Sequence, residues 1–252
     1  MSLVALACLF ALVFSLAIGW LVLRAAGPGL VSALTSPEMR HALWLTVWTS
    51  LLSGMLVMIF AIPVGYGLSR VRFHGSRLVR TVLYLPIALP QIVLGLCLLL
   101  LFSSWPATAL LRPLGIELLF TWQGVVVAQF FTAFPYAVRV LKSTFDSIDP
   151  RLEFVSRSLG HSPLGTAWRV SLPLARGGIL AAGAIAFARC AGAFGSVLVL
   201  AGGMRMRTET LPIALYLNLS CGDMDAAIAA GLLLVLMSSV GIYAIERMEA
   251  KP

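Results

Sequence analysis

The chain has 252 residues, of which 60% are hydrophobic and only 11% are charged, and its formal net charge is +8. A soluble globular domain has roughly a quarter of its residues charged, because charged side chains keep its surface in water. The composition therefore excludes a soluble domain and indicates an integral membrane protein.

Six apolar runs in the sequence are each long enough to cross a bilayer as a helix. A helix needs about 20 mainly apolar residues to cross a hydrocarbon core of about 30 Å, whereas a barrel strand needs only about ten. The runs are continuous and do not alternate, so we predict an all-α membrane protein with one domain of about six spans. The predicted spans are residues 3–23, 45–69, 81–104, 119–141, 176–201 and 224–246.

Prolines occur inside several of these runs, at Pro63, Pro86, Pro90 and Pro135. A proline kinks a transmembrane helix, and neighbouring helices must then satisfy the carbonyls that it frees. The sequence therefore predicts a packed bundle of helices.

The first run differs from a secretion signal. It has no cationic start, its apolar stretch exceeds the usual length of about 7–15 residues, and no cleavage site precedes Arg24. We interpret it as a retained first span.

The cationic residues predict the orientation in the membrane. With six spans, one side holds twelve of the eighteen, namely Arg70, Arg72, Arg77, Arg80, Arg139, Lys142, Arg151, Arg157, Arg169, Arg176, Arg247 and Lys251. Lys and Arg concentrate on the cytoplasmic side of membrane proteins. We therefore expect both termini and these loops to be cytoplasmic, although Arg24 after the first span argues against it.

The long connection between the fourth and fifth runs is too polar to cross a membrane, yet it has helical periodicity. Asp149-Pro150 predicts a helix start, Gly160 a helix end, and Ser162-Pro163 a second helix that Leu172-Pro173 closes. Apolar residues at helical spacing line one face, namely Leu152, Val155, Leu159, Ala167 and Val170. Such a helix pair either lies on lipid headgroups or docks its apolar face into a cytoplasmic partner, and periodicity does not separate the two.

The fifth run is rich in small residues, which let helices approach closely within one subunit or across a two-fold interface. It also carries Arg189, the only charge more than two residues from the end of a predicted span. An arginine at the bilayer centre is costly, so its side chain should face the bundle or a wet cavity. The following segment, 202–225, is either a plain surface loop, a lid, or a docking surface for an outer partner.

The sequence lacks the motifs for ATP binding, metal binding and ion coupling. It has no G-x-x-x-x-G-K-[ST] phosphate loop, and its three histidines and four cysteines are scattered without metal-ligand spacing. All acidic residues lie outside the predicted spans or within two residues of a span end, so the embedded acids that ion-coupled carriers use are missing. We therefore expect no catalytic residue, no metal and no bound cofactor, and we disfavour a secondary transporter or channel.

The spacing Gly160, nine residues, Val170, one residue, Leu172-Pro173 resembles the cytoplasmic signature of ABC importer permeases. That signature begins with Glu-Ala-Ala, where this chain has Phe154, Val155 and Ser156, with Glu153 one place early. Other runs are most similar to the molybdate/tungstate and sulfate branch. They are Leu85-Pro86 with Pro90 and Gly95, Phe134-Pro135-Tyr136 with Arg139, residues 149–153, residues 157–163, Phe187-Ala188-Arg189 with Phe194-Gly195, and Thr208-Glu209-Thr210-Leu211-Pro212.

The resemblance implies a type I importer permease with coupling helices at residues 149–168 that contact a separate ATPase, which would hold ATP and Mg. The implied coupling residues are Glu153, Phe154, Val155, Ser156, Arg157, Leu159, Gly160, His161 and Ser162. The implied partners are a second permease copy, two cytoplasmic ATPase subunits, an extracytoplasmic oxyanion-binding protein and the lipid bilayer, with no nucleic acid.

The resemblance also suggests a translocation path or gate at Pro90, Arg189, Phe194 and Gly195. Two interpretations of Arg189 stay open. Its side chain either bonds to free carbonyls or snorkels to the membrane interface, or it attracts an oxyanion or closes a gate. The related permeases usually carry a glutamate just before the Phe-Gly pair, where this chain has Ala193. The cargo would be molybdate or tungstate, with sulfate, thiosulfate or another anion as the alternative.

Overall fold

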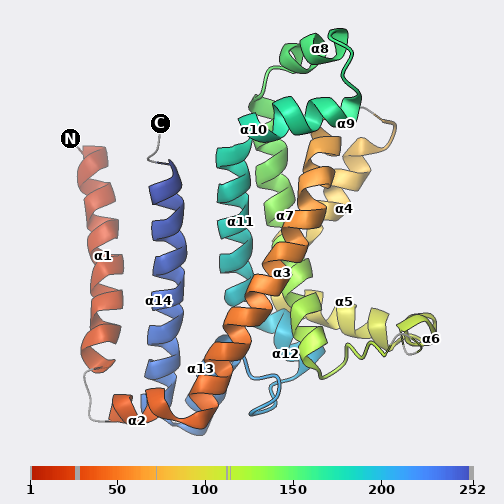
Figure 1. The fold of residues 1–252 in the computed structure, drawn as a ribbon. Coiled ribbons are helices and arrows are strands. Elements are labelled where there is room, and N and C mark those ends of the chain that lie inside the picture. Colours follow the sequence, from red (N-terminus) through yellow and green to blue (C-terminus); the bar gives the residue numbers. More distant parts are fainter. Residues whose placement is uncertain (1, 26–28, 72, 112, 114, 250–252) are drawn as a thin grey trace. The chain divides into compact units, whose positions relative to one another are not determined.

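The computed structural model describes residues 2–25, 29–71, 73–111, 113 and 115–249, and no strand occurs among these residues (Figure 1). The all-α prediction is confirmed. Of the charges used to predict orientation, Arg72 and Lys251 lie outside the described residues. The chain divides into two compact units, residues 1–46 with 203–237 and residues 47–202 with 238–252.

Among the described residues, four helices are long and apolar enough to cross a membrane, and the number rises to six if each of two bent helix pairs is one span. The four are Val4–Arg24 in α1, Pro37–Arg70 (α3), Trp122–Ser147 (α7) and Met224–Gly241 in α14. The bent pairs are α4 (Ser76–Ala88) with α5 (Gln91–Ser103), and Pro163–Leu174 with α11 (Arg176–Ala191).

Two predicted spans are not continuous helices. The expected span at 81–104 is α4 and α5, which meet at an angle of 117°. Leu89 is extended and Pro90 starts α5, because a proline disfavours helical geometry in the residue before it. The expected span at 176–201 consists of two helices, α11, which ends at Ala191, and α12 (Gly195–Ala201). Pro90 therefore breaks a helix where the sequence predicted only a kink, and the break between Ala191 and Gly195 was not predicted.

In the larger unit, α7 packs against α3, α4, α11 and α12. Its buried face is rich in small residues, such as Ala133 and Ala137, and meets Ala182 and Ala186 of α11. Small side chains allow close helix approach where lipid supplies no hydrophobic driving force. Buried polar groups also join the helices, since the Gln129 side chain donates to Thr49 Oγ1 at 3.2 Å and accepts from Ser53 at 2.9 Å. The rest of this unit holds α6 (Trp105–Leu111) and the segment between α7 and α11.

Helices α5 and α12 approach so closely that Gly95 has no space for a side chain. A Cβ atom at Gly95 would lie 2.9 Å from both Ser196 Cα and Val199 Cβ of α12. These are atoms of the backbone and of a β-branched side chain, so they cannot move aside without shifting the helix.

The substitution Gly95→Ala should therefore destabilise the protein by about 1–3 kcal/mol, the usual cost of overpacking. Gly67→Ala in α3 is the matched control, because a Cβ there meets nothing within 4 Å. Thermal unfolding of both variants in detergent tests this. Equal melting temperatures for the two would contradict the close approach.

The smaller unit contains α1 (Ser2–Ala25), α2 (Gly29–Thr35), the start of α3, α13 (Leu211–Cys221) and most of α14 (Met224–Glu249). Its core joins Met39 and Ala42 of α3 to α13 and α14. The Leu211 N–H donates to Thr46 Oγ1 at 2.8 Å, which fixes the start of α13 against α3. Within the predicted outer segment at 202–225, residues 211–221 are therefore a packed helix.

Glu209, just before α13, is 2% exposed, and its Oε2 atom has no hydrogen-bond partner. Burial raises the pKa of this carboxyl above its ordinary value, although the charge of Arg205 partly opposes the effect. The neutral acid is therefore favoured in the folded state. A raised carboxyl pKa means that folding stability falls as the pH rises from the ordinary pKa through the folded one.

The substitution Glu209→Gln should thus stabilise the protein at neutral pH, and the difference should vanish below the ordinary carboxyl pKa of about 4.3. Chemical unfolding of wild type and variant across this pH range measures it. A destabilised variant at neutral pH would show that the charged form is the one that the fold needs.

Candidate functional site

The connection between α7 and α11 forms a helical protrusion. Helix α8 (Pro150–Ser158) begins at Asp149, whose side chain accepts a hydrogen bond from the Arg151 N–H at 2.9 Å. It ends at Gly160, whose φ of +89° favours a residue without a Cβ. Helix α9 (Pro163–Thr166) begins at Ser162, which accepts from the Gly165 N–H at 3.1 Å. The helix–turn–helix predicted from these residues is present.

The second helix of the protrusion ends within one residue of its predicted end. After α9 the chain forms a π turn (Ala167–Ser171) and the short α10 (Leu172–Leu174), and the bend before α11 follows. In the π turn, the Leu172 N–H bonds to the carbonyl of Ala167, five residues earlier. This wider turn precedes Pro173 and accommodates a residue that cannot donate a backbone hydrogen bond. Leu172-Pro173 therefore lies in the last turn of the helix, which ends at Leu174.

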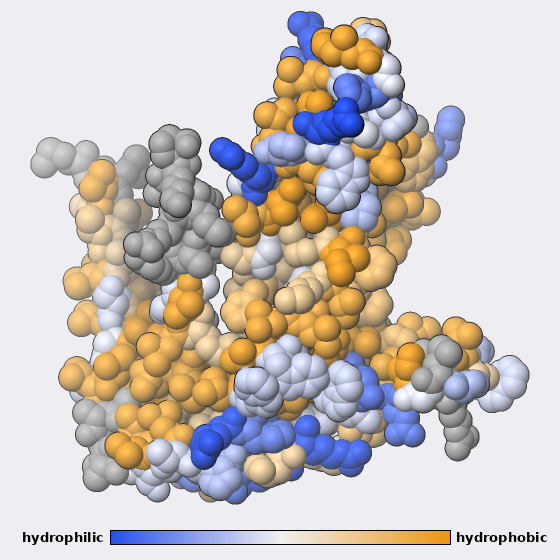
Figure 2. Space-filling view, in the orientation of Figure 1, coloured by the Kyte–Doolittle hydropathy of each residue, from blue (hydrophilic) through white to orange (hydrophobic). Residues whose placement is uncertain are grey.

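Helix α8 buries two polar side chains and exposes its apolar ones together with Arg151 and Arg157, whereas an ordinary surface helix buries its apolar side chains. Glu153 is 5% exposed and Ser156 is also buried, whereas Phe154 is 72% exposed. The exposed apolar side chains of the protrusion, which we call the apolar tip, are Leu152, Phe154, Val155, Leu159, Leu164 and Trp168. Figure 2 shows hydrophobic side chains at the end of the protrusion beside hydrophilic ones. An apolar surface of this kind marks an interaction site.

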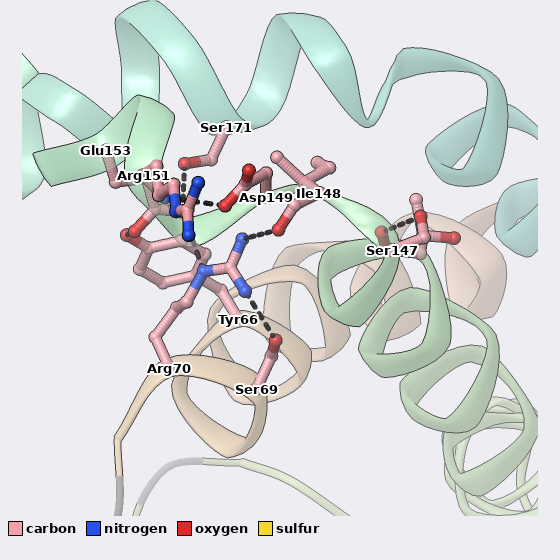
Figure 3. A network of polar contacts seen from close by, with 10 residues as sticks. Tyr66, Ser69, Arg70, Ser147, Ile148, Asp149, Arg151, Glu153 and Ser171 are labelled. Carbon is pink, nitrogen blue, oxygen red and sulfur yellow. Dashed lines mark hydrogen bonds and ion pairs between the residues drawn. The ribbon is translucent and has the colours of Figure 1, made fainter. Parts of the chain in front are cut away.

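Glu153 attaches α8 to the end of α3 (Figure 3). Its Oε1 atom accepts from Arg70 Nε at 2.7 Å and from Ser171 Oγ at 2.7 Å, and its Oε2 accepts from the Tyr66 hydroxyl at 3.2 Å. Arg70 also donates to the Ile148 carbonyl at 3.0 Å. The network thus joins the last turns of α3, the start of α8 and the π turn that leads toward α11.

The charge state of Glu153 follows from these contacts. Burial opposes ionisation, but hydrogen bonds from Ser171 and Arg70 and the positive charge of Arg70 outweigh it. The pKa of Glu153 is therefore lowered from its ordinary value. The carboxylate is charged at neutral pH and is paired with Arg70.

A second set of contacts holds α8 against α9. Ser156 Oγ lies 3.1 Å from Thr166 Oγ1, and His161 Nδ1 donates to the Ser156 carbonyl at 3.2 Å. The other ring nitrogen of His161 then accepts from Arg169 Nη1 at 2.6 Å. These bonds fix the position of the imidazole ring and, with it, the turn between the two helices.

The structure separates the predicted coupling residues into two groups. Phe154, Val155, Arg157, Leu159, Gly160 and Ser162 lie on the outer surface of the protrusion. Glu153 and Ser156 are buried against the chain itself, and His161 is half-buried between α8 and α9. They position the protrusion. Arg70, Tyr66 and Ser171 belong to the same network, but no local sequence signal indicates this because they lie outside α8.

The predicted path residues also fall into two places. Pro90, Phe194 and Gly195 come together where α5 meets α12, and the Gln91 side chain accepts from the backbone N–H groups of Phe194 and Gly195 at 3.1 and 3.2 Å. Arg189 is not part of this contact, since its guanidinium lies over the Tyr136 ring of α7 at 4.0 Å. Sequence reasoning assigned no role to Gln91.

Comparison with known proteins adds independent findings. Residues 58–250 match the family model described as the inner membrane component of binding-protein-dependent transport systems. The chain is 34% identical to the probable molybdenum ABC transporter permease protein of Haloferax volcanii, over 96% of this chain and 87% of that protein. It is 32% identical to the probable sulfate transport system permease protein of Nephroselmis olivacea, over 87% of this chain and 78% of that protein.

A solved structure supports the fold. The bacterial alginate ABC transporter, crystallised in complex with an alginate pentasaccharide-bound periplasmic protein, contains a chain that matches with a TM-score of 0.74. The match covers 98% of this chain and 92% of that chain, at 17% sequence identity. The molybdenum and sulfate relatives are similar to this chain to nearly the same degree, so identity alone does not choose between their cargoes.

Proposed function

We propose that this chain forms the membrane path for molybdate or tungstate. It belongs to the family of binding-protein-dependent transport system inner membrane components, and it is a permease subunit of an ABC importer. The molybdenum relative supports this cargo. Sulfate or thiosulfate is the second candidate, which the sulfate relative supports. The family's ATP hydrolysis is carried out by a separate subunit.

The observation that supports the coupling role is the inverted polarity of α8. Leu152, Phe154 and Leu159 expose apolar surface, while Glu153 and Ser156 fix the helix from the other side. An apolar helix face held rigidly in this way suits a groove on a cytoplasmic partner. In Figure 1, α9 and α10 lie between α8 and the ends of α7 and α11, a position that favours docking over lying flat on lipid headgroups.

The network gives a physical route for the coupling. Two ATPase subunits that bind ATP and Mg would close and displace α8 in each of two permease copies. Glu153 would pass this displacement to α3 through Arg70 and toward α11 through Ser171. An extracytoplasmic binding protein would deliver the oxyanion to the other face. In this arrangement both chain termini lie in the cytoplasm, as the distribution of arginine and lysine predicts.

Reconstitution tests the proposal. The permease, its ATPase and its binding protein are incorporated in proteoliposomes, and uptake of molybdate, tungstate, sulfate and thiosulfate is measured with and without ATP. We expect ATP-dependent uptake of molybdate or tungstate. Uptake of sulfate but not of molybdate or tungstate would establish the second candidate. Transport under an ion gradient by the permease without its ATPase would contradict the coupling role.

A further inference from the structure

Two arginines and a tyrosine share one open cavity in the larger unit. Tyr136 and Arg139 of α7 and Arg189 of α11 line a space of about 370 Å³, together with the small side chains of Ala184 and Ala188. Tyr136 lies near the middle of α7, and Arg189 is the third-last residue of α11, whose last residue is Ala191. Both arginines are exposed in the single chain.

Neither arginine has a carboxylate partner among the described residues. The ion pairs found there are Arg70 with Glu153 and Lys142 with Asp146, and no acidic side chain lines the cavity. Arg189 contacts the face of the Tyr136 ring, which orients its guanidinium without neutralising it. Two positive charges that have no carboxylate partner in the described part of the chain are costly next to lipid on membrane-spanning helices, so they are expected to face a wet cavity and to attract an anion.

We infer that Tyr136, Arg139 and Arg189 form a binding site for a tetrahedral oxyanion within the membrane path, an inference that rests on the proposed function. Two guanidinium groups match the two negative charges of molybdate, tungstate or sulfate, and each can donate two parallel hydrogen bonds to a pair of oxyanion oxygens. The Tyr136 hydroxyl is a further donor. The site recognises charge and tetrahedral shape, so it accepts all three dianions and leaves discrimination to the binding protein.

A lipid phosphate offers the same chemistry, so the test must separate it from a dissolved oxyanion. The probe is Ala188→Cys, because Ala188 is exposed and lines the cavity. The full transporter complex carries this substitution. Its exposed native thiols are replaced by serine, and they are Cys8, Cys97 and Cys221. It is placed in nanodiscs of phosphatidylcholine, with or without added phosphatidylglycerol, and the rate of labelling by an anionic methanethiosulfonate reagent is measured.

We expect molybdate and sulfate to slow the labelling of the thiol introduced by Ala188→Cys in both kinds of nanodisc. The double variant Arg139→Gln/Arg189→Gln should weaken this protection by about tenfold or more, because charge-assisted hydrogen bonds are lost. Arg176→Gln is the matched control, since it removes the same charge from the start of α11, away from the cavity. Arg189→Lys keeps the charge and should retain part of the protection even if the double variant folds poorly.

Three outcomes would overturn the site. They are protection that appears only with phosphatidylglycerol, protection that survives in the double variant, and no protection by any oxyanion in a preparation that transports it. The uptake assay on the same wild-type complex separates this from the proposed function. A complex that transports no oxyanion refutes the function, whereas a transporting complex without protection refutes the site alone.

Discussion

Replacing Glu153 by alanine is expected to abolish ATP-driven uptake while the chain still inserts into the membrane. The substitution leaves the guanidinium of Arg70 without its carboxylate, and both side chains are largely buried. Breaking a buried ion pair by removing one partner costs about 3–5 kcal/mol, because the remaining charge stays desolvated. Without the network, α8 keeps its helix caps but loses its attachment to α3 and to Ser171.

The measurements are ATP-driven uptake, ATP hydrolysis and thermal unfolding of the complex. The matched control is Glu117→Ala, which removes an exposed acid outside the network and should behave like wild type. Glu153→Gln should be intermediate, because an amide oxygen can still accept from Ser171 but does not pair with the charge of Arg70. If Glu153→Ala transported as well as Glu117→Ala, the network would have no part in coupling.

The lowered pKa of Glu153 sets the pH range of this contribution. For a carboxyl group whose folded pKa lies below its unfolded pKa, the stabilisation is fully present above the unfolded value and is lost as the pH falls through the folded one. The attachment of α8 should therefore be constant between neutral pH and about pH 5, and weaken only below the ordinary value of about 4.3. Limited proteolysis of the protrusion as a function of pH would show this.

The sequence predicted those features of the protrusion that depend on neighbouring residues. Asp149 and Pro150 start α8 and Gly160 ends it through contacts within a few positions along the chain. The buried position of Glu153 could not be predicted in this way, because its partner Arg70 lies 83 residues earlier. Apolar periodicity showed that Leu152, Val155 and Leu159 share a face, but it did not show that this face points outward, since a polar network covers the other side.

The helix breaks also depend partly on neighbouring residues, which the sequence shows, and partly on packing between distant helices, which it does not show. Proline at position 90 predicted a disturbed helix, and the local rule about the preceding residue explains the extended Leu89. The size of the bend, 117°, depends on the packing of α5 against α12, where Gly95 and Gly195 allow contact that no side chain would permit. Likewise, the charge of Arg189 was visible in the sequence, but Tyr136 and Arg139 join it only because α7 and α11 pack together.

Truncating the apolar tip should uncouple the transporter without destabilising it. Phe154 and Leu159 are exposed, so Phe154→Ala and Leu159→Ala remove little packing from the isolated chain. If Phe154 fills a pocket on the ATPase, its loss should cost about 2 kcal/mol or more of binding free energy, or roughly a thirtyfold weaker complex. The affinity of the ATPase for the permease in nanodiscs and ATP-driven uptake should both fall, while the melting temperature stays unchanged.

The control for Phe154→Ala is Phe14→Ala in α1, a similarly exposed phenylalanine on a helix that is apolar throughout. A polarity-sensitive fluorophore at Leu159→Cys then separates docking from contact with lipid. Docking predicts a blue shift when the ATPase is added and no quenching by brominated lipids. Quenching by brominated lipids before any ATPase is present, together with normal uptake by Phe154→Ala, would place the apolar tip on the membrane surface and remove the basis for its role in coupling.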